Sequence, residues 1–193
     1  MVDRYKSFAE LSTHEVEGID YSVTFIGRRA RSFLIAAPHA GVIEVGTSAI
    51  SELVAAKDYS LYRFESHKIV DEDYVSLHLT SHIFDEPVCI NATKTHETVV
   101  TIHGCNDCQE IVYLGGLDRS LIGNVAQNIR NLGVDVRTEN HRFPGVHHKN
   151  ICNRGFSGAG IQVELSEPLR RPNNYTRLVP AIRRSLKSRL ATI

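Results

Sequence analysis

Residues 33–47 read FLIAAPHAGVIEVGT, and this stretch decides how the chain is expected to fold. Its first five residues, 33–37, are all apolar, which predicts a strand that is buried on both faces of a sheet. Pro38 has no N–H to donate to a sheet ladder, so we expect the strand to end near it. His39 would then lie at the carboxyl end of a buried strand, which is where open α/β sheets bind their ligands.

The same stretch carries two side chains that can hold a metal. Gly41 permits a sharp turn after His39, and Glu44 follows, so an imidazole and a carboxylate can converge on one divalent ion. A catalytic zinc usually takes three protein ligands and keeps one position for water. The third is expected at the end of another strand, where the β-branched run 97–102 leads into His103. For each of these histidines, a hydrogen-bonded residue without metal is the alternative interpretation.

Strand and helix patterns alternate along most of the chain. Apolar periodicity of two predicts strands, and uninterrupted apolar runs predict buried ones, over residues 21–26, 33–37, 58–65, 76–80, 97–102, 111–114, 134–137 and 161–165. Helical spacing predicts helices over 5–11, 47–56, 87–94, 118–132 and from 174 onward, and the polar stretch 66–75 is expected to be a loop. Thr47 and Asp118 are the expected caps of two helices. The alternation predicts an α/β fold with a mixed open β-sheet and helices on both faces.

Composition limits the classes of protein to which the chain can belong. Its 193 residues suit a single domain over 1–193, and 42% hydrophobic with 23% charged residues is ordinary for a soluble globular protein. A formal net charge of zero argues against non-specific nucleic-acid binding. No apolar run approaches the roughly 20 residues that span a bilayer. The first residues contain no apolar signal core, so we expect a cytoplasmic protein that reaches the medium only on cell lysis, and a monomer.

Two further groups of polar residues fall near expected strands. His78 and His82 belong to residues 76–87, which are rich in ligand and acid–base types, and an exposed strand end is the alternative. Glu164 lies inside the apolar pattern of 161–165, and burial of a carboxyl is costly unless it is paired or used. An edge strand that leaves Glu164 in water is the alternative there.

The cysteines do not form a recognisable framework. Cys105 and Cys108 make a C-x-x-C pair that suits a redox site or half of a structural zinc site. No second closely spaced Cys/His pair has the spacing of a zinc finger or ribbon. We therefore favour two reduced thiols in a loop beside the site.

Several motifs together resemble one family. In chain order they are 37–47 (APHAGVIEVGT), 77–81 (LHLTS), 84–87 (FDEP), His103-Gly104, 115–117 (GGL), Asn153-Arg154 and 160–166 (GIQVELS). This combination is similar to the poly-γ-glutamate hydrolases of bacteria and their phages. The resemblance covers the chain from about residue 20 to 171.

The resemblance implies a fold, a cofactor and a reaction. The fold would be similar to that of the zinc carboxypeptidases, with one Zn²⁺ per chain held at the positions of His39, Glu44 and His103. Glu164 would be the catalytic glutamate. The reaction would be hydrolysis of the γ-amide bonds of poly-γ-glutamate, a polyanionic partner.

One further catalytic residue, Arg154, and three substrate-binding residues are predicted. Arg154 is our first choice for the cation that stabilises an oxyanion or holds a substrate carboxylate, because a guanidinium binds carboxylates bidentately. His78 and His82 are expected to orient ligands or bind substrate, and Asn153 is expected to bind substrate.

Two other functions fit the same residues. One is a zinc amidase or carboxypeptidase-like enzyme that acts on small N-acyl amino acids or peptides. The other is a non-catalytic module with a structural metal at His103, Cys105 and Cys108. The missing second Cys/His pair makes this module the weaker alternative.

Overall fold

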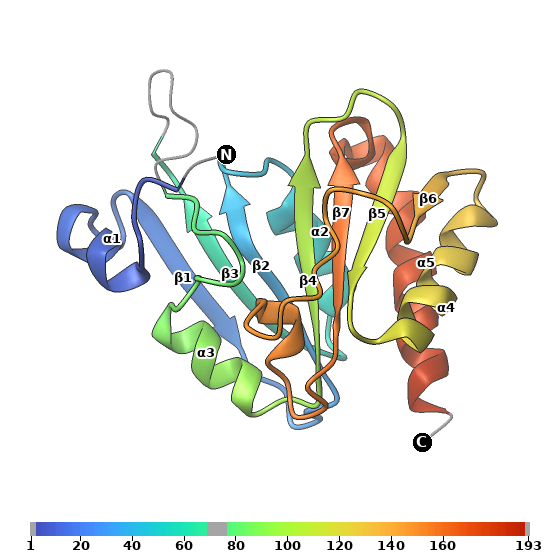
Figure 1. The fold of residues 1–193 in the computed structure, drawn as a ribbon, viewed down its shortest axis with the longest axis horizontal. Helices are drawn as coiled ribbons and strands as arrows, with labels where there is room; N and C mark the ends of the chain where they lie inside the picture. Colours follow the sequence, from blue (N-terminus) through green and yellow to red (C-terminus); the bar gives the residue numbers. More distant parts are fainter. Residues whose placement is uncertain (1–2, 69–76, 192–193) are drawn as a thin grey trace.

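A mixed β-sheet runs through the middle of the computed structural model, which describes residues 3–68 and 77–191 (Figure 1). Within those residues seven strands follow the order β1-β3-β2-β4-β7-β5-β6. In the central series β3-β2-β4-β7, each strand is parallel to the next. On the two sides of this series, β1 pairs antiparallel with β3, and β5 pairs antiparallel with β7. The strands are β1 Tyr21–Ile26, β2 Phe33–Gly41, β3 Ser60–Ser66, β4 Thr98–Cys105, β5 Ile111–Gly116, β6 Asp135–Arg137 and β7 Ile161–Ser166.

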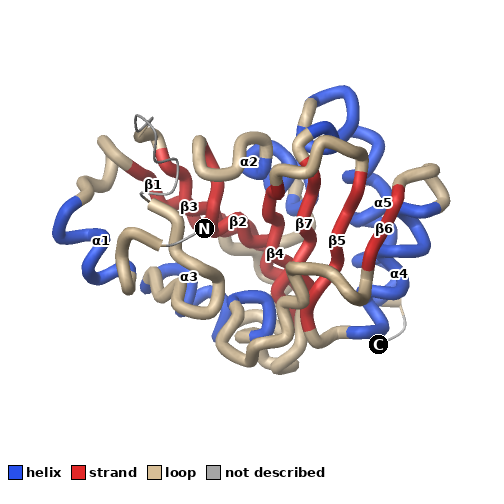
Figure 2. Tube along the Cα trace, turned by 45° about the horizontal axis from the view of Figure 1, so that its top comes forward, coloured by secondary structure: helices blue, strands red, loops and turns tan. Residues whose placement is uncertain are grey.

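Helices cover both faces of this sheet, as Figure 2 shows. They are α1 Phe8–His14, α2 Thr47–Ala55, α3 Pro87–Lys94, α4 Arg119–Arg130 and α5 Pro172–Leu190, with short 3₁₀ helices η1 Ile151–Asn153 and η2 Pro168–Arg170. Strand β2 explains the two layers, because Phe33 and Ile35 pack in the core with α2, α4 and α5. Leu34 and Ala36 point to the opposite core, beneath α1 and α3. The predicted α/β fold with helices on both faces is therefore confirmed.

The predicted end of β2 at Pro38 is wrong, since the strand continues to Gly41. Pro38 is tolerated because it falls at an irregularity of the ladder. β2 pairs with β4 only as far as Ala36, and its register with β3 shifts between Ala37 and Ala40. The bulge needs no N–H from Pro38 and still carries His39 to the carboxyl edge of the sheet.

The predicted strand 76–80 is wrong over residues 77–80, which form no strand in the structure. Residue 76 and most of the expected loop 66–75 lie outside the described residues. The backbone of 77–80 bonds to side chains instead of to a ladder. The amide of Thr80 donates to Asp3 Oδ2, and the carbonyl of Leu79 accepts a hydrogen bond from His39 Nε2. Leu77 and Leu79 are nevertheless buried, which explains why their alternation resembled a strand.

Helix starts show one confirmed cap and one difference. Asp118 Oδ1 accepts the amide of Leu121 at 2.9 Å at the start of α4, as predicted. Helix α2 has Gly46 as its N-cap, without a side-chain cap, and Thr47 instead donates its hydroxyl to the Glu44 carbonyl at 2.8 Å. None of the helices in the described ranges is both long and apolar enough to cross a membrane.

Two glycines give a matched test of the packing. A Cβ on Gly160 would lie 2.0 Å from the Cys152 carbonyl oxygen and 2.3 Å from that of Val99, whereas one on Gly123, in α4, would meet nothing within 4 Å. We expect Gly160→Ala to lower the free energy of unfolding by about 1–3 kcal/mol. Gly123→Ala should raise it by about 0.5–1 kcal/mol, because alanine favours helix. Urea denaturation measures both, and equal effects of the two substitutions would contradict this packing.

Candidate active site

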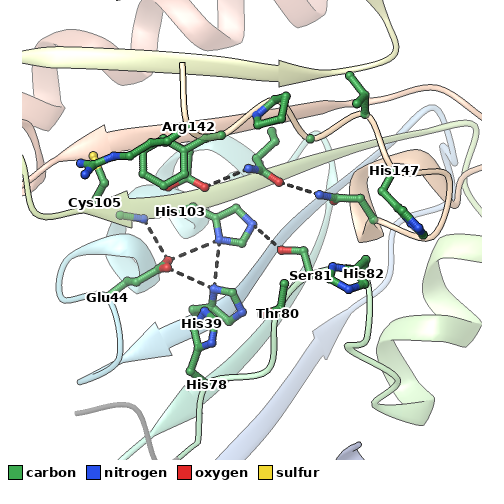
Figure 3. A pocket seen from close by; sticks show the side chains of 18 of the residues that line it. His39, Glu44, His78, Thr80, Ser81, His82, His103, Cys105, Arg142 and His147 are labelled. Atoms are coloured by element: carbon green, nitrogen blue, oxygen red, sulfur yellow. Dashed lines mark hydrogen bonds and ion pairs between the residues drawn. The ribbon is translucent and has the colours of Figure 1, made fainter. Parts of the chain in front are cut away.

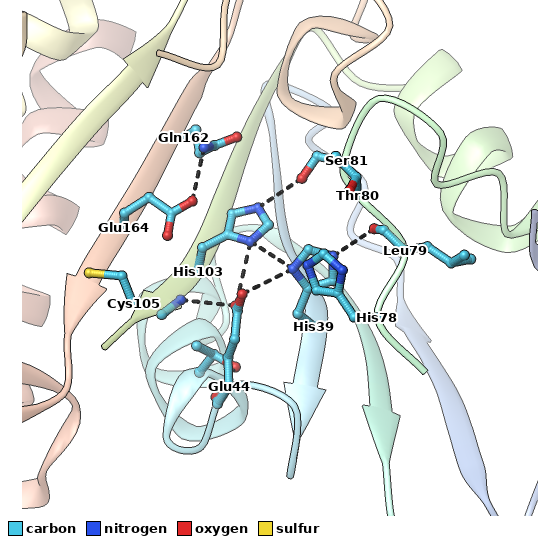
Figure 4. Close-up of polar contacts among 12 residues, drawn as sticks. His39, Glu44, His78, Leu79, Thr80, Ser81, His103, Cys105, Gln162 and Glu164 are labelled. Carbon is cyan, nitrogen blue, oxygen red and sulfur yellow. Dashed lines mark hydrogen bonds and ion pairs between the residues drawn. The ribbon is translucent and has the colours of Figure 1, made fainter. Parts of the chain in front are cut away.

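Three donor side chains meet at the carboxyl edge of the sheet (Figure 4). His39 Nδ1 lies 3.1 Å from Glu44 Oε1 and 3.1 Å from His103 Nδ1, and His103 Nδ1 lies 3.5 Å from Glu44 Oε2. His39 comes from β2, His103 comes from β4, and Glu44 comes from the turn that leads into α2. We call these three residues the donor cluster. The structure thus brings together the three residues that the resemblance assigned to zinc.

The turn after β2 returns Glu44 to the strand end. Gly41 has a φ of +70°, and a Cβ there would lie 2.2 Å from the Ser66 carbonyl oxygen, so only glycine fits. The amide of Glu44 then donates to the His39 carbonyl at 3.0 Å, which closes the turn. The amide of Gly104 donates to Glu44 Oε2 at 2.9 Å and orients the carboxylate.

The donor cluster fits a tetrahedral zinc ion. Bonds of 2.0–2.1 Å in a tetrahedron place neighbouring donor atoms about 3.3 Å apart. Here the two Nδ1 atoms lie 3.1 Å from each other, His39 Nδ1 lies 3.1 Å from Glu44 Oε1, and His103 Nδ1 lies 3.5 Å from the other carboxylate oxygen, Oε2. His39 Nε2 donates to the Leu79 carbonyl at 2.8 Å, which leaves the lone pair of the neutral ring on Nδ1, facing the cluster. His103 Nε2 lies 3.5 Å from Ser81 Oγ.

Two buried carboxyls have opposite electrostatic environments. Burial by itself raises the pKa of Glu44, but the adjacent His39 and His103 outweigh it and hold the pKa below its usual value. Burial raises the pKa of Glu164 well above its usual value, and the negative charge of Glu44 adds to this. A carboxyl with a raised pKa is suited to exchange protons near neutral pH.

Glu164 is beside the donor cluster on the neighbouring strand. It pairs in register with His103 across β4 and β7, and its side chain is 5% exposed. Because β7 lies between β4 and β5, the edge-strand alternative is excluded. Gln162 Nε2 donates to Glu164 Oε1 at 2.9 Å, and Asn150 Nδ2 donates to Gln162 Oε1 at 2.8 Å. This chain of amides orients the carboxyl.

A cavity of about 630 Å³ opens onto these residues (Figure 3). His78 and His82 line it, as do the donor cluster and Glu164. His39, Glu44 and His78 also form a group that could hold a metal ion, because one donor atom from each lies within 4.8 Å of the others. Burial, reinforced by His39, lowers the pKa of His78 to about 4.

Arg154 and Asn153, for which catalysis and substrate binding were predicted, are not among the residues that line the cavity. The guanidinium of Arg154 donates to the carbonyls of Lys149, Phe84 and His82, at 2.6, 3.1 and 3.1 Å. The side-chain Nδ2 of Asn153 donates to the carbonyls of Gly145 and His147. Its Oδ1 accepts hydrogen bonds from the backbone N–H groups of Leu117 and Gly160. Both side chains hold the cavity wall in place from behind.

The cation that does line the cavity is Arg142, which the sequence analysis did not single out. Its Nη2 donates to Asp107 Oδ2 at 2.7 Å, and its guanidinium carbon lies 4.9 Å from the centre of the Phe143 ring. These contacts hold the charge at the cavity mouth. The only sequence signal was an arginine in a long polar loop, which is too common to indicate a site.

The cysteines have no metal-binding arrangement. All four are free, Cys105 lines the cavity, and Cys108 is exposed. Among the described residues, no group of three metal-binding side chains includes a cysteine. His103 Nδ1 contacts His39 and Glu44, so the alternative of a structural metal at His103, Cys105 and Cys108 has no support. The interpretation of the cysteines as reduced thiols fits the structure.

Comparison with known proteins identifies a family. A family model described as poly-gamma-glutamate hydrolase matches residues 5–178. The SPbeta prophage-derived protein YoqZ of Bacillus subtilis (strain 168) is 34% identical in an alignment 180 residues long, which covers 90% of this chain and 63% of YoqZ. The chain therefore spans less than two thirds of the length of that relative.

Solved structures match over the whole fold. A bacteriophage poly-gamma-glutamate hydrolase superposes with a TM-score of 0.93 and 28% identity, and all of both chains is covered. A zinc-free apo form of YndL gives a TM-score of 0.89 and 29% identity, and covers 97% of this chain and 99% of the YndL chain. The α/β fold predicted from the sequence is therefore shared with both of these proteins.

Thiol alkylation tests the environment of the cysteines. Burial raises the pKa of Cys105 to about 11 and that of Cys152 to about 12. Because the thiolate is the nucleophile, we expect iodoacetamide at pH 8 to modify exposed Cys108 first, well before the three buried cysteines. Mass spectrometry of timed samples measures this order, and urea-unfolded protein, in which all four react, is the control. Equal rates for Cys105 and Cys108 in the folded protein would contradict the structure.

Proposed function

We propose, because the chain belongs to the poly-gamma-glutamate hydrolase family, that it hydrolyses the γ-glutamyl amide bonds of poly-γ-glutamate with one zinc ion per chain. His39, Glu44 and His103 would hold the ion, and residues 1–193 would act as one catalytic domain. The observation that carries this proposal is the spacing of the donor cluster, 3.1–3.5 Å, on the wall of a cavity that also contains Glu164.

The residues of the cavity have separate tasks in this proposal. Zinc, when bound, supplies a Lewis acid that polarises the scissile carbonyl and lowers the pKa of a water molecule. Glu164 takes a proton from that water and returns one to the leaving amine. Gln162 bonds Oε1 of Glu164, which leaves Oε2 to exchange the proton. Burial around Glu164 supports this task, because it raises the pKa of the carboxyl above its ordinary value and so makes the carboxylate a stronger base.

Arg142 replaces Arg154 as the proposed contact to substrate carboxylate. Poly-γ-glutamate carries a free α-carboxylate on each unit, so its enzyme needs a cation in the cavity. Among the described residues that line the cavity, Arg142 is the one arginine or lysine. Its bond to Asp107 uses one edge of the guanidinium, and further donors remain for a carboxylate.

Removal of the metal or of the base tests this proposal. We expect the zinc-loaded protein to shorten poly-γ-glutamate, and a chelator or His39→Ala to abolish both zinc binding and cleavage. Glu164→Gln should keep about one zinc per chain while turnover falls about 10²- to 10⁴-fold, because only the proton acceptor is lost. Size-exclusion chromatography of the polymer and metal analysis of the protein measure these quantities.

The other outcomes separate the alternatives. An intact polymer combined with cleavage of a small N-acyl amino acid or peptide would favour the small-substrate amidase. Absence of zinc from the purified, zinc-treated protein would refute the metal site. Near-full activity of Glu164→Gln would show that the base is a different residue.

The role of Arg142 can be tested through substrate affinity. Arg142→Ala should raise the KM for poly-γ-glutamate about 10- to 100-fold, because a hydrogen bond to a charged group contributes about 1.5–3 kcal/mol, while its zinc content stays unchanged. Arg137→Ala is the matched control, since Arg137 also pairs with an aspartate but does not line the cavity. Steady-state kinetics measure both variants. A KM for Arg142→Ala within twofold of that of the control would rule out this contact.

A further inference from the structure

A carboxylate from the N-terminal segment contacts the wall of the candidate active site. Asp3 Oδ1 lies 2.6 Å from His78 Nδ1, and Asp3 Oδ2 accepts the amide of Thr80 at 2.9 Å. The side chains of Asp3 and His78 are each 13% exposed. One carboxylate thus binds the chain on both sides of Leu79, across a sequence separation of 75 residues.

The bond to Asp3 determines which nitrogen of His78 carries hydrogen. Burial by itself raises the pKa of Asp3, but hydrogen bonds from Thr80 and His78 outweigh it and keep the pKa below its usual value. The ionised carboxylate can only accept hydrogen bonds. The hydrogen of the His78 ring must therefore be on Nδ1, and in the neutral ring Nε2 has the lone pair.

Leu79, which lies between the two residues that contact Asp3, orients the imidazole of His39. The carbonyl of Leu79 accepts a hydrogen bond from His39 Nε2 at 2.8 Å. This bond leaves the Nδ1 lone pair of His39 directed at Glu44 and His103. The rings of His39 and His78 also lie close, with centroids 4.1 Å apart. A shift of residues 78–80 would therefore disturb a proposed zinc ligand as well as its neighbour.

We infer that Asp3 is a positioning residue for the metal site: its carboxylate holds residues 78–80 in the arrangement that orients the His39 imidazole and sets the tautomer of His78. The inference rests on the proposed function for the identity of the ligand, a divalent metal ion. Asp3 itself is not placed among the metal ligands.

The rest of the N-terminal segment has anchors of its own. Tyr5 is buried and its hydroxyl bonds Glu15 Oε1 at 2.6 Å. The amide of Phe8 donates to Asp85 Oδ1, and its ring packs edge-on against Tyr21. The isosteric change Asp3→Asn should therefore leave the segment docked, but its single side-chain oxygen cannot replace both carboxylate oxygens, so either the bond from Thr80 or the bond from His78 Nδ1–H is lost.

The experiment uses the full chain and zinc alone as the probe. Competition with a chromophoric chelator measures the Kd for zinc, and we expect Asp3→Asn to raise it about 10- to 100-fold, the range for loss of an outer-shell partner of a metal ligand. Asp135→Asn is the matched control, because Asp135 lies on β6 and is about half exposed. A Kd for Asp3→Asn within twofold of that of the control would overturn the inference.

A second measurement needs neither zinc nor a variant. Long-range ¹H–¹⁵N correlation spectra of the zinc-free protein at pH 7.5 report which ring nitrogen of each histidine carries hydrogen. We expect Nδ1–H for His78 and Nε2–H for His39, and the opposite tautomer of His78 would overturn the role of Asp3 even if Asp3→Asn does not fold. If the unmodified protein binds no zinc, the proposed function fails, and the spectra still decide whether Asp3 orients the two imidazoles.

Discussion

The carboxylate of Glu44 lies between two imidazoles, 3.1 Å from one and 3.5 Å from the other, and is mostly shielded from water. An ionised carboxylate in such a place is costly unless a cation or hydrogen-bond donors compensate it. The Gly104 amide supplies one donor. In the proposed zinc site, the two inward Nδ1 atoms would be ligands of the ion and its charge would compensate the carboxylate. Much of the surrounding structure serves to keep these donor atoms together.

The parallel strands β2 and β4 bring His39 and His103 to the same edge of the sheet, and β7 adds Glu164 beside them. A second layer of polar groups then orients the donors: the Leu79 carbonyl binds His39, and Gln162 binds Glu164. Metal ligands generally depend on such outer contacts for their orientation. Asp3 extends the same layer by holding the backbone on either side of Leu79.

Three arginines near the cavity illustrate how differently one residue type is used. Arg154 and Arg170 each donate to three backbone carbonyls, so their guanidinium groups stabilise loops. Arg142 is held by a single carboxylate and lines the cavity. The proposed polyanionic substrate would require a cation with free hydrogen-bond donors, and Arg142 meets this requirement better than the other two arginines. The distinction depends on distant carbonyls, so no local pattern contains it.

The sequence by itself determined the α/β architecture and the three members of the donor cluster, because strand periodicity is local and a residue at a strand end reaches the edge of the sheet whatever surrounds it. It also identified Glu164 as a carboxyl within an apolar strand. Only the tertiary structure decided that β2 continues through Pro38, that residues 77–80 leave the sheet, and that Arg142 and not Arg154 lines the cavity. The physical reason is that each of these outcomes depends on hydrogen-bond partners from distant parts of the chain, such as Asp3 for Thr80, and folding alone brings those partners together.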